Sequence, residues 1–116
     1  MNQNEIRSML PLTPKAFHIL TALANEPLNG YRLGLQVEQS SDGAIRMSPG
    51  TLYENVHRLA ERGLIREVKG GLGVSKDGRG QRFYDLTDKG LEVLRAEVTR
   101  LARDLRLARS IPGVVE

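Results

Sequence analysis

The stretch MSPGTLYENVHRL, residues 47–59, decides the fold of this chain. Its start carries two helix signals: the Ser48 hydroxyl can accept a hydrogen bond from a free backbone N–H one turn on, and Pro49 follows at the first helical position. Leu52, Val56 and Leu59 recur at intervals of four and three residues, so they share one face of a helix. We therefore predict a short helix that packs on the rest of the chain through this apolar face.

The opposite face of this helix is chemically varied. It carries an aromatic residue, a His and small residues where a surface helix usually mixes Lys and Glu: Gly50, Tyr53, Glu54, His57 and Glu61. Such a face is typical of a helix that reads a partner, and we call this segment the reading helix. An ordinary amphipathic surface helix is the alternative interpretation.

Two further helices are predicted before the reading helix. The first covers about residues 14–25 after the cap residue Thr13, and the second about residues 31–39 after the cap residue Asn29. The second helix has candidates for its buried face: Leu33, Val37 and, as an open question, Tyr31. We expect residues 1–9 to be loose, with a turn of helix as the alternative.

A hairpin is predicted after the reading helix. A short extended piece, residues 44–47, leads into that helix, which ends at Gly63, a natural left-handed cap. Two strand-like segments, residues 64–69 and 81–86, flank the loop 70–80, in which five of eleven residues are Gly. Cations lie in and beside this loop: Lys69, Lys76, Arg79 and Arg82.

The last predicted helix begins after the cap residue Thr87 and carries a heptad seam. Its apolar residues are spaced three and four apart: Leu91, Leu94, Val98, Leu101 and Leu105. Two heptads are too short for an independent coiled coil, so we expect this seam to form the interface of a homodimer. The seam is flanked by Arg95, Arg100, Arg103, Arg106 and Arg109. We favour solvated flanking charges for these arginines.

Composition excludes several classes of protein. The chain has 116 residues, enough for one domain, a formal charge of +3 and no cysteine, so disulfides, thiolate metal sites and a cysteine nucleophile are excluded. No apolar run has membrane-spanning length, and the first residues lack the pattern of a signal peptide, so we expect a cytoplasmic protein. No catalytic triad, carboxylate pair, phosphate-binding loop or metal-ligand spacing is recognisable. We therefore expect no enzyme activity, no cofactor and no metal site.

The order of the predicted elements is that of a winged helix-turn-helix: three helices, of which the third is the reading helix, and then a basic hairpin. An α-helix fits the major groove of DNA and presents its side chains to base edges. A basic hairpin beside it can follow phosphates or enter the minor groove, and its Lys and Arg residues release counterions from the duplex. These elements together predict a DNA-binding protein. The arginines beside the heptad seam would then have a second DNA-facing surface as the alternative to solvated flanking charges.

At this point the chain resembles the PadR-like transcriptional regulators. The motifs that carry the resemblance are LNGY at 28–31, GTLY at 50–53, HRL at 57–59, RGLI at 62–65 and GRGQRFYDLTDKG at 78–90. The resemblance spans roughly residues 12–108, and it is closest to the compact branch with a single C-terminal helix. It implies a dimeric repressor in which the C-terminal helix forms the dimer. It also implies that a small apolar effector enters near the dimer centre and relieves repression.

The chain departs from the family pattern at three points. Glu54 follows the TLY motif where family members often have Pro, and it places a negative charge on the expected DNA face. Gly80 stands where Pro is common, which loosens the hairpin loop. The chain has no Trp, so the binding of aromatic drugs between tryptophans, as in some compact members, does not carry over.

These observations predict an α+β, mainly α chain that forms a winged helix-turn-helix with an added C-terminal dimerisation helix. We expect an N-terminal segment at 1–11, a DNA-binding region at 12–86, the dimerisation helix at 87–110 and a tail at 111–116. The candidate DNA-binding residues are Ser48, Thr51, Tyr53, Glu54, His57, Arg58, Lys76, Arg79 and Arg82. For Thr51, completing the helix cap is an equally good interpretation.

The predicted function is a homodimeric, sequence-specific regulator, a repressor in our interpretation, that binds a pseudo-palindromic operator in double-stranded DNA. The alternative is a winged-helix module that binds other proteins and has no specific DNA target. The acidic residues Glu54 and Glu61 on the reading face are the feature that favours this alternative.

Overall fold

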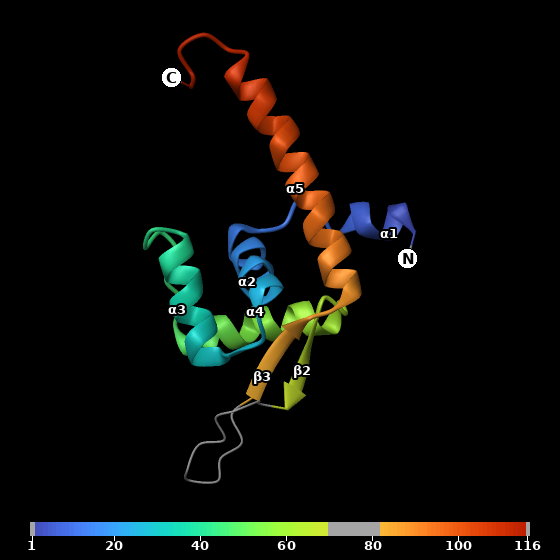
Figure 1. Cartoon of the computed structure of the whole chain (residues 1–116), viewed down its shortest axis with the longest axis vertical. Coiled ribbons are helices and arrows are strands. Elements are labelled where there is room, and N and C mark those ends of the chain that lie inside the picture. Colours follow the sequence, from blue (N-terminus) through green and yellow to red (C-terminus); the bar gives the residue numbers. More distant parts are fainter. Residues whose placement is uncertain (1, 70–81, 116) are drawn as a thin grey trace.

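The chain forms five helices and a small sheet in the part that the structure describes, residues 2–69 and 82–115 of a computed structural model (Figure 1). The elements are α1 (Gln3–Ser8), α2 (Pro14–Asn25), β1 (Leu28–Asn29), α3 (Gly30–Ser40), α4 (Pro49–Glu61), β2 (Ile65–Lys69), β3 (Arg82–Leu86) and α5 (Asp88–Arg109). The predicted fold class, α+β and mainly α, is confirmed. The reading helix is α4.

The helix starts lie where the sequence places them. Thr13, Asn29, Ser48 and Thr87 each precede a helix in extended backbone, and each side chain accepts a hydrogen bond from the backbone N–H three residues on. After α4, Gly63 adopts a φ of +77°, the left-handed conformation that ends a helix. These boundaries depend on local interactions, and the sequence therefore predicts them well.

Two of the lesser segments differ from the expectation, because α1 and β1 are present in the structure. Residues 3–8 form α1, which Asn2 caps, and Ile6 on this helix is buried in the core. A strand that was not predicted, β1, pairs antiparallel with β3 and completes a three-stranded sheet of order β1-β3-β2.

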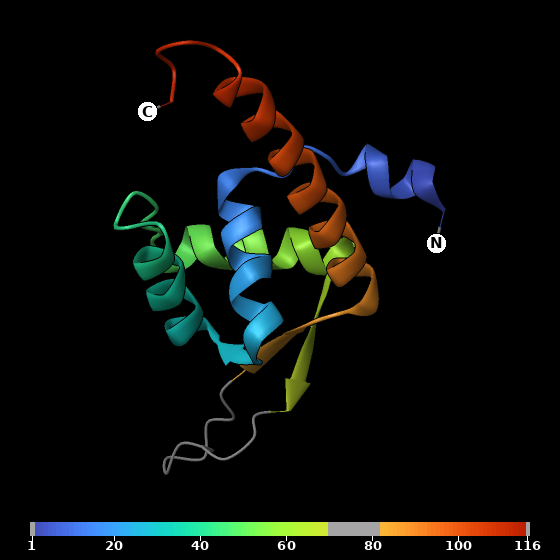
Figure 2. The same cartoon turned by 45° about the horizontal axis from the view of Figure 1, so that its top comes forward.

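The core is assembled around α2. This helix contacts α3, α4 and α5, and Figure 2 shows it between α3 and α5 with α4 crossing beside it. Its fully buried residues are Ile19, Leu20 and Leu23. From α4 the predicted stripe is buried against this core: Leu52, Val56 and Leu59. The docking face of the reading helix is thus confirmed.

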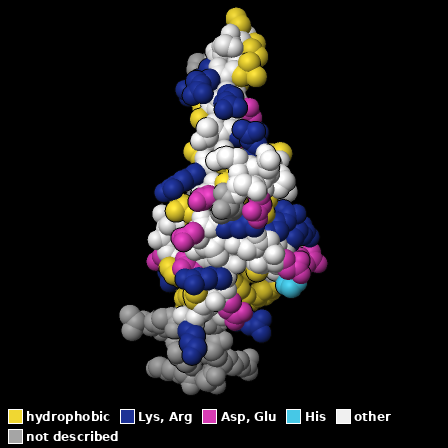
Figure 3. Space-filling view, turned by 90° about the vertical axis from the view of Figure 1, so that its right-hand side faces the viewer, with side chains coloured by type: hydrophobic (Ala, Val, Ile, Leu, Met, Phe, Trp, Pro, Cys, Tyr) yellow, Lys and Arg dark blue, Asp and Glu magenta, His cyan; other side chains and the backbone are white. Residues whose placement is uncertain are grey.

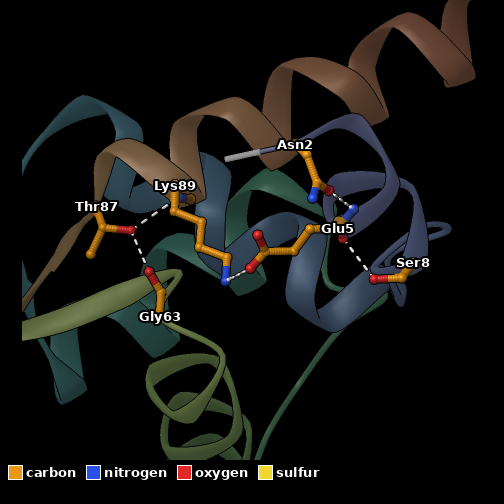
Figure 4. Close-up of polar contacts among 7 residues, drawn as sticks. Asn2, Glu5, Ser8, Gly63, Thr87 and Lys89 are labelled. Carbon is orange, nitrogen blue, oxygen red and sulfur yellow. Dashed lines mark hydrogen bonds and ion pairs between the residues drawn. The ribbon is translucent and has the colours of Figure 1, made fainter.

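The start of α5 is fixed against the end of α4 and against α1 (Figure 4). The Thr87 hydroxyl donates to the Gly63 carbonyl at 2.6 Å and accepts from the Gly90 N–H at 3.0 Å. Next to it, Lys89 Nζ lies 2.5 Å from Glu5 Oε1 of α1, and this hydrogen bond lowers the pKa of the Glu5 carboxyl. The joint therefore sets the direction in which α5 leaves the winged helix.

A second joint holds the middle of α5 to the segment before α2. The buried Glu97 carboxylate accepts a hydrogen bond from the Leu12 N–H at 2.6 Å and another from Arg100 Nε at 2.5 Å. Arg100 also donates to Asp104 at 2.9 Å, and its contact with Glu97 raises the pKa of the guanidinium further. Beyond this joint α5 extends away from the core, as Figure 1 shows.

Candidate nucleic-acid interface

Ser48 and Thr51 at the start of α4 are bonded to each other. The Ser48 hydroxyl accepts from the Thr51 N–H at 3.2 Å and donates to the Thr51 hydroxyl at 3.1 Å. Both hydroxyls therefore take part in the helix cap. For Thr51 this geometry favours the capping interpretation over a phosphate contact.

The outward face of α4 presents the predicted reading residues to solvent. Tyr53, Glu54, His57 and Arg58 are all exposed, whereas the stripe on the other side of the helix is buried. His57 Nε2 lies 2.9 Å from Glu61 Oε1, one turn further along the helix. Glu61 therefore has a contact partner on its own helix. Glu54 is the acidic residue of α4 that lies nearest to the start of the helix.

Tyr53 also lies across the beginning of α3. A Cβ built on Gly30 would stand 3.0 Å from the Tyr53 hydroxyl oxygen, so the absence of a side chain at Gly30 accommodates the phenol. Half of the Tyr53 surface remains exposed. The residue therefore bridges the two helices of the helix-turn-helix and still offers a face to a partner.

The base of the predicted hairpin is basic. In the antiparallel register of β2 and β3, Lys69 stands opposite Arg82, and both are exposed. Like charges in directly opposed positions repel each other, so this pair is more favourable beside an anion. Arg82 Nε is 3.7 Å from Glu67 Oε1, a contact between exposed groups. Lys76 and Arg79, the other predicted contacts of the hairpin, lie outside the described residues.

Tyr84 supports the hairpin base from inside. It is buried on β3, opposite Glu67 of β2. Burial is the largest cause that raises the pKa of the Tyr84 phenol, and the neighbouring Tyr53 and Glu67 raise this pKa further. The ring is therefore a neutral packing group that anchors the strands beside α4.

The seam on α5 is divided between two environments. Leu94 is only 8% exposed and packs in the core of its own chain, and Leu91 is half-buried. This position argues against Leu94 as a partner-facing residue. By contrast, Val98, Leu101 and Leu105 remain exposed. In the view of Figure 3, Lys and Arg side chains recur along the column formed by α5.

Tyr31 is a further residue of this surface, and it is absent from the predicted site residues. The residue is 77% exposed, so the possibility that it faces inward is wrong. The signal was present in the spacing, because Tyr31 and the buried Leu33 are two residues apart and so lie about 200° apart around a helix of 3.6 residues per turn. Tyr31 and Tyr53 line the same cavity between α3 and α4.

Comparison with known proteins identifies the family of this fold. The model of the transcriptional regulator PadR-like family matches residues 19–96, which include α3, α4, both hairpin strands and the start of α5. The chain belongs to the PadR-like family. The resemblance seen in the sequence motifs is therefore confirmed, and the PadR-like family consists of transcriptional regulators, not enzymes.

Two relatives share a large part of this sequence. The chain is 36% identical over 97 residues to the transcriptional regulator Rv3488 of Mycobacterium tuberculosis, covering 83% of this chain and 80% of that protein. It is 38% identical over 85 residues, 73% of its own length, to an uncharacterized 37.1 kDa protein in transposon TN4556 of Streptomyces fradiae, of which it spans 22%.

A solved structure of a PadR protein shares the fold. Bacillus subtilis PadR in complex with operator DNA superposes with a TM-score of 0.60 at 21% identity, over 78% of this chain and 48% of that one. The winged helix-turn-helix of this PadR-like chain is thereby confirmed. Within residues 2–69 and 82–115, no helix is long and apolar enough to cross a membrane, and no group of three or more acidic or His side chains is placed to hold a metal ion.

Proposed function

We propose that this PadR-like chain is a homodimeric repressor that binds a pseudo-palindromic operator through α4 and the adjacent hairpin. The observation that carries the proposal is the exposed set on α4, Tyr53, His57 and Arg58, beside a hairpin base that ends in the opposed cations Lys69 and Arg82. A helix face with varied hydrogen-bonding groups suits base readout, and cations beside it suit phosphate.

The dimer in this proposal is formed by the exposed part of α5. Between about a third and a half of the surface of Val98, Leu101 and Leu105 is exposed. An exposed apolar stripe of this kind is typical of a helix that packs against a partner. The arginines around it are solvated in this arrangement. A two-fold dimer would then present two α4 helices about 34 Å apart, one turn of DNA.

Regulation completes the proposal. Displacement of the repressor by a small apolar molecule is implied by the family resemblance, and a ligand that binds the DNA-free form more tightly shifts the population toward that form. Its location near the dimer centre is the expectation from the resemblance alone.

DNA binding is tested with the segment upstream of the chain's own reading frame. We expect saturable binding in a fluorescence anisotropy titration, with clearly weaker binding to random DNA of the same length. Tyr53→Phe should weaken binding to the upstream DNA more than to random DNA, since only a specific contact uses the phenol hydroxyl. Equal losses on both sequences would remove Tyr53 from base readout, and no binding to either would leave a protein-binding module as the function.

The hairpin base is tested by replacing Lys69 and Arg82 with Gln. Because each neutralised phosphate contributes about 0.9 to the slope of log K against log salt, we expect the double variant to show a flatter slope and weaker binding to all sequences. An unchanged slope would contradict a phosphate contact at this position. The variant Arg7→Gln, on α1, is the matched control for the loss of a positive charge.

A further inference from the structure

Exposed large apolar side chains fall into two groups among the described residues. One group lies on the outer part of α5 and the segment after it: Val98, Leu101, Leu105, Leu107, Ile111, Val114 and Val115. The other group consists of Tyr31, Leu35 and Tyr53 between α3 and α4. The proposed dimer uses three members of the first group, Val98, Leu101 and Leu105. Leu35, exposed on the middle of α3, is not among the residues that the proposed function uses, so the second group requires a different explanation.

The second group lines a cavity of about 320 Å³, which we call the α3–α4 crevice. Its walls are mostly apolar and aromatic: Tyr31, Gly34, Leu35, Met47, Leu52 and Tyr53. Ligand sites are typically concave, apolar cavities of about 300 Å³ or more with a few polar groups. A cavity of about 150 Å³ accepts one benzene ring, so the α3–α4 crevice has room for two fused rings.

Gly34 keeps this crevice open. It lies in the middle of α3, where a glycine costs about 1 kcal/mol relative to alanine. A Cβ built on Gly34 would lie 3.7 Å from Leu52 Cδ2, an ordinary van der Waals contact, and the backbone there has no left-handed φ. Neither packing nor backbone geometry therefore requires glycine. A larger side chain at this position would fill the space between the helices.

The charges at the rim of the crevice are already paired. Arg46 Nε lies 3.0 Å from Glu38 Oε1, and both groups line the same cavity. A charged ligand would have to compete with this pair, whereas an uncharged ligand leaves it intact. Tyr31 and Tyr53 offer ring faces for stacking from two different helices, which suits a planar aromatic molecule.

We propose that the α3–α4 crevice binds a small, uncharged, bicyclic aromatic molecule and that its occupancy excludes DNA. The exclusion of DNA rests on the proposed function, in which Tyr53 contacts the operator, because the ligand would stack on this same residue. The crevice also includes Pro49 at the start of the reading helix. The site lies on the helix-turn-helix itself, separate from the α5 seam where the family resemblance implies an effector.

Binding is tested with 2-naphthol as the probe and the full ¹⁵N-labelled chain. We expect saturable shifts of the backbone amides of residues 30–35 and 50–53 as 2-naphthol is added. Gly34→Leu should weaken the binding by about tenfold or more, since the new side chain fills the crevice. Tyr31→Ala is the second variant, because its exposed side chain can be removed without loss of the fold, and it should also weaken binding. Shifts confined to α5, or no saturable shifts in the unmodified chain, would overturn the site.

Exclusion of DNA is measured separately, by titrating 2-naphthol into the complex with the upstream DNA. The apparent Kd for DNA should rise with 2-naphthol concentration in the unmodified chain and stay constant in Gly34→Leu. An unchanged Kd at saturating 2-naphthol would overturn the exclusion. A chain that binds no DNA even without 2-naphthol would refute the proposed function instead, and the amide shifts would still decide whether the crevice is a ligand site.

Discussion

Glu97 is the buried charge that joins α5 to the segment before α2. Burial by itself raises the pKa of this carboxyl, but the hydrogen bonds from Arg100 and the Leu12 N–H outweigh it and hold the pKa below its ordinary value. The unfolded chain therefore binds a proton at a higher pH than the folded chain. The contribution of Glu97 to stability is complete above the ordinary carboxyl pKa and is lost as the pH falls through the folded-state pKa.

The substitution Glu97→Gln should remove the contribution of the Glu97 charge to stability. At pH 7 we expect the free energy of unfolding to fall by about 1–3 kcal/mol, because the buried carboxylate that accepts from the Leu12 N–H and from Arg100 loses its charge. The difference from the unmodified chain should shrink as the pH is lowered below the ordinary carboxyl pKa, in urea unfolding at a series of pH values. Glu92→Gln, at an exposed position of the same helix, is the matched control and should stay within about 0.5 kcal/mol. A loss of the same size at every pH would contradict the role of the charge.

Gly90 is required by close packing and not by backbone conformation. A Cβ at this position would stand 2.1 Å from the Leu64 carbonyl oxygen, a backbone atom that cannot move away cheaply. Gly90→Ala should therefore destabilise the fold by about 1–3 kcal/mol or more, measured as a lower Tm and denaturation midpoint. Gly50→Ala is the control, since nothing lies within 4 Å of a Cβ there, and it should be neutral or stabilising. Equal effects of the two changes on stability would show that helix propensity, and not close packing, determines the effect of Gly90→Ala.

The residues that sequence reasoning found and missed differ in the range of their interactions. Thr13, Ser48 and Thr87 were predicted as caps because each bonds to a backbone group three residues away. Glu97 was not predicted as a buried group, because one of its partners, Leu12, is 85 residues away. Nothing in the local pattern around Glu97 distinguishes it from a solvated helix charge.

At the scale of elements, periodicity predicts a helix and its apolar stripe but not the surface on which the stripe packs. The heptad spacing on α5 is continuous, yet Leu94 is buried in the core of its own chain and Val98 is exposed. The dividing point follows from where Thr87 and Glu97 fix α5 to the winged helix. Similarly, the two-residue strand β1 exists through its pairing with β3, and so short a segment has no periodicity of its own.

The exposed part of α5 leads to a prediction about assembly. Val98→Gln combined with Leu101→Gln should convert the proposed dimer to a monomer in light scattering coupled to size exclusion, because the polar amides remove the apolar stripe while keeping helix propensity. Leu107→Gln is the matched control: its side chain is 66% exposed, and position 107 lies two residues beyond Leu105 and so on another face of the helix. A dimer that persists in the double variant would place the interface on another surface.

At the scale of the whole molecule, the proposed dimer and DNA surfaces do not compete for space. The molecule measures 58 × 34 × 23 Å, and Figure 1 shows the outer end of α5 and the hairpin strands at opposite ends of it. A partner that packs on the outer part of α5 therefore leaves α4 and the hairpin base uncovered. Dimerisation through α5 then doubles the number of reading helices without hiding them.

This geometry makes the spacing of operator half-sites the decisive property. A rigid dimer places its two α4 helices on one side of the duplex, about one turn apart. Inserting about five base pairs between the half-sites rotates the second one to the far side of the DNA. We expect the affinity to fall to that of a duplex with one half-site, because the second reading helix then faces bases other than those of its half-site. A scrambled second half-site of unchanged length is the matched control and should give the same affinity as the insertion. If the insertion left the affinity unchanged, each chain would bind DNA independently of its partner.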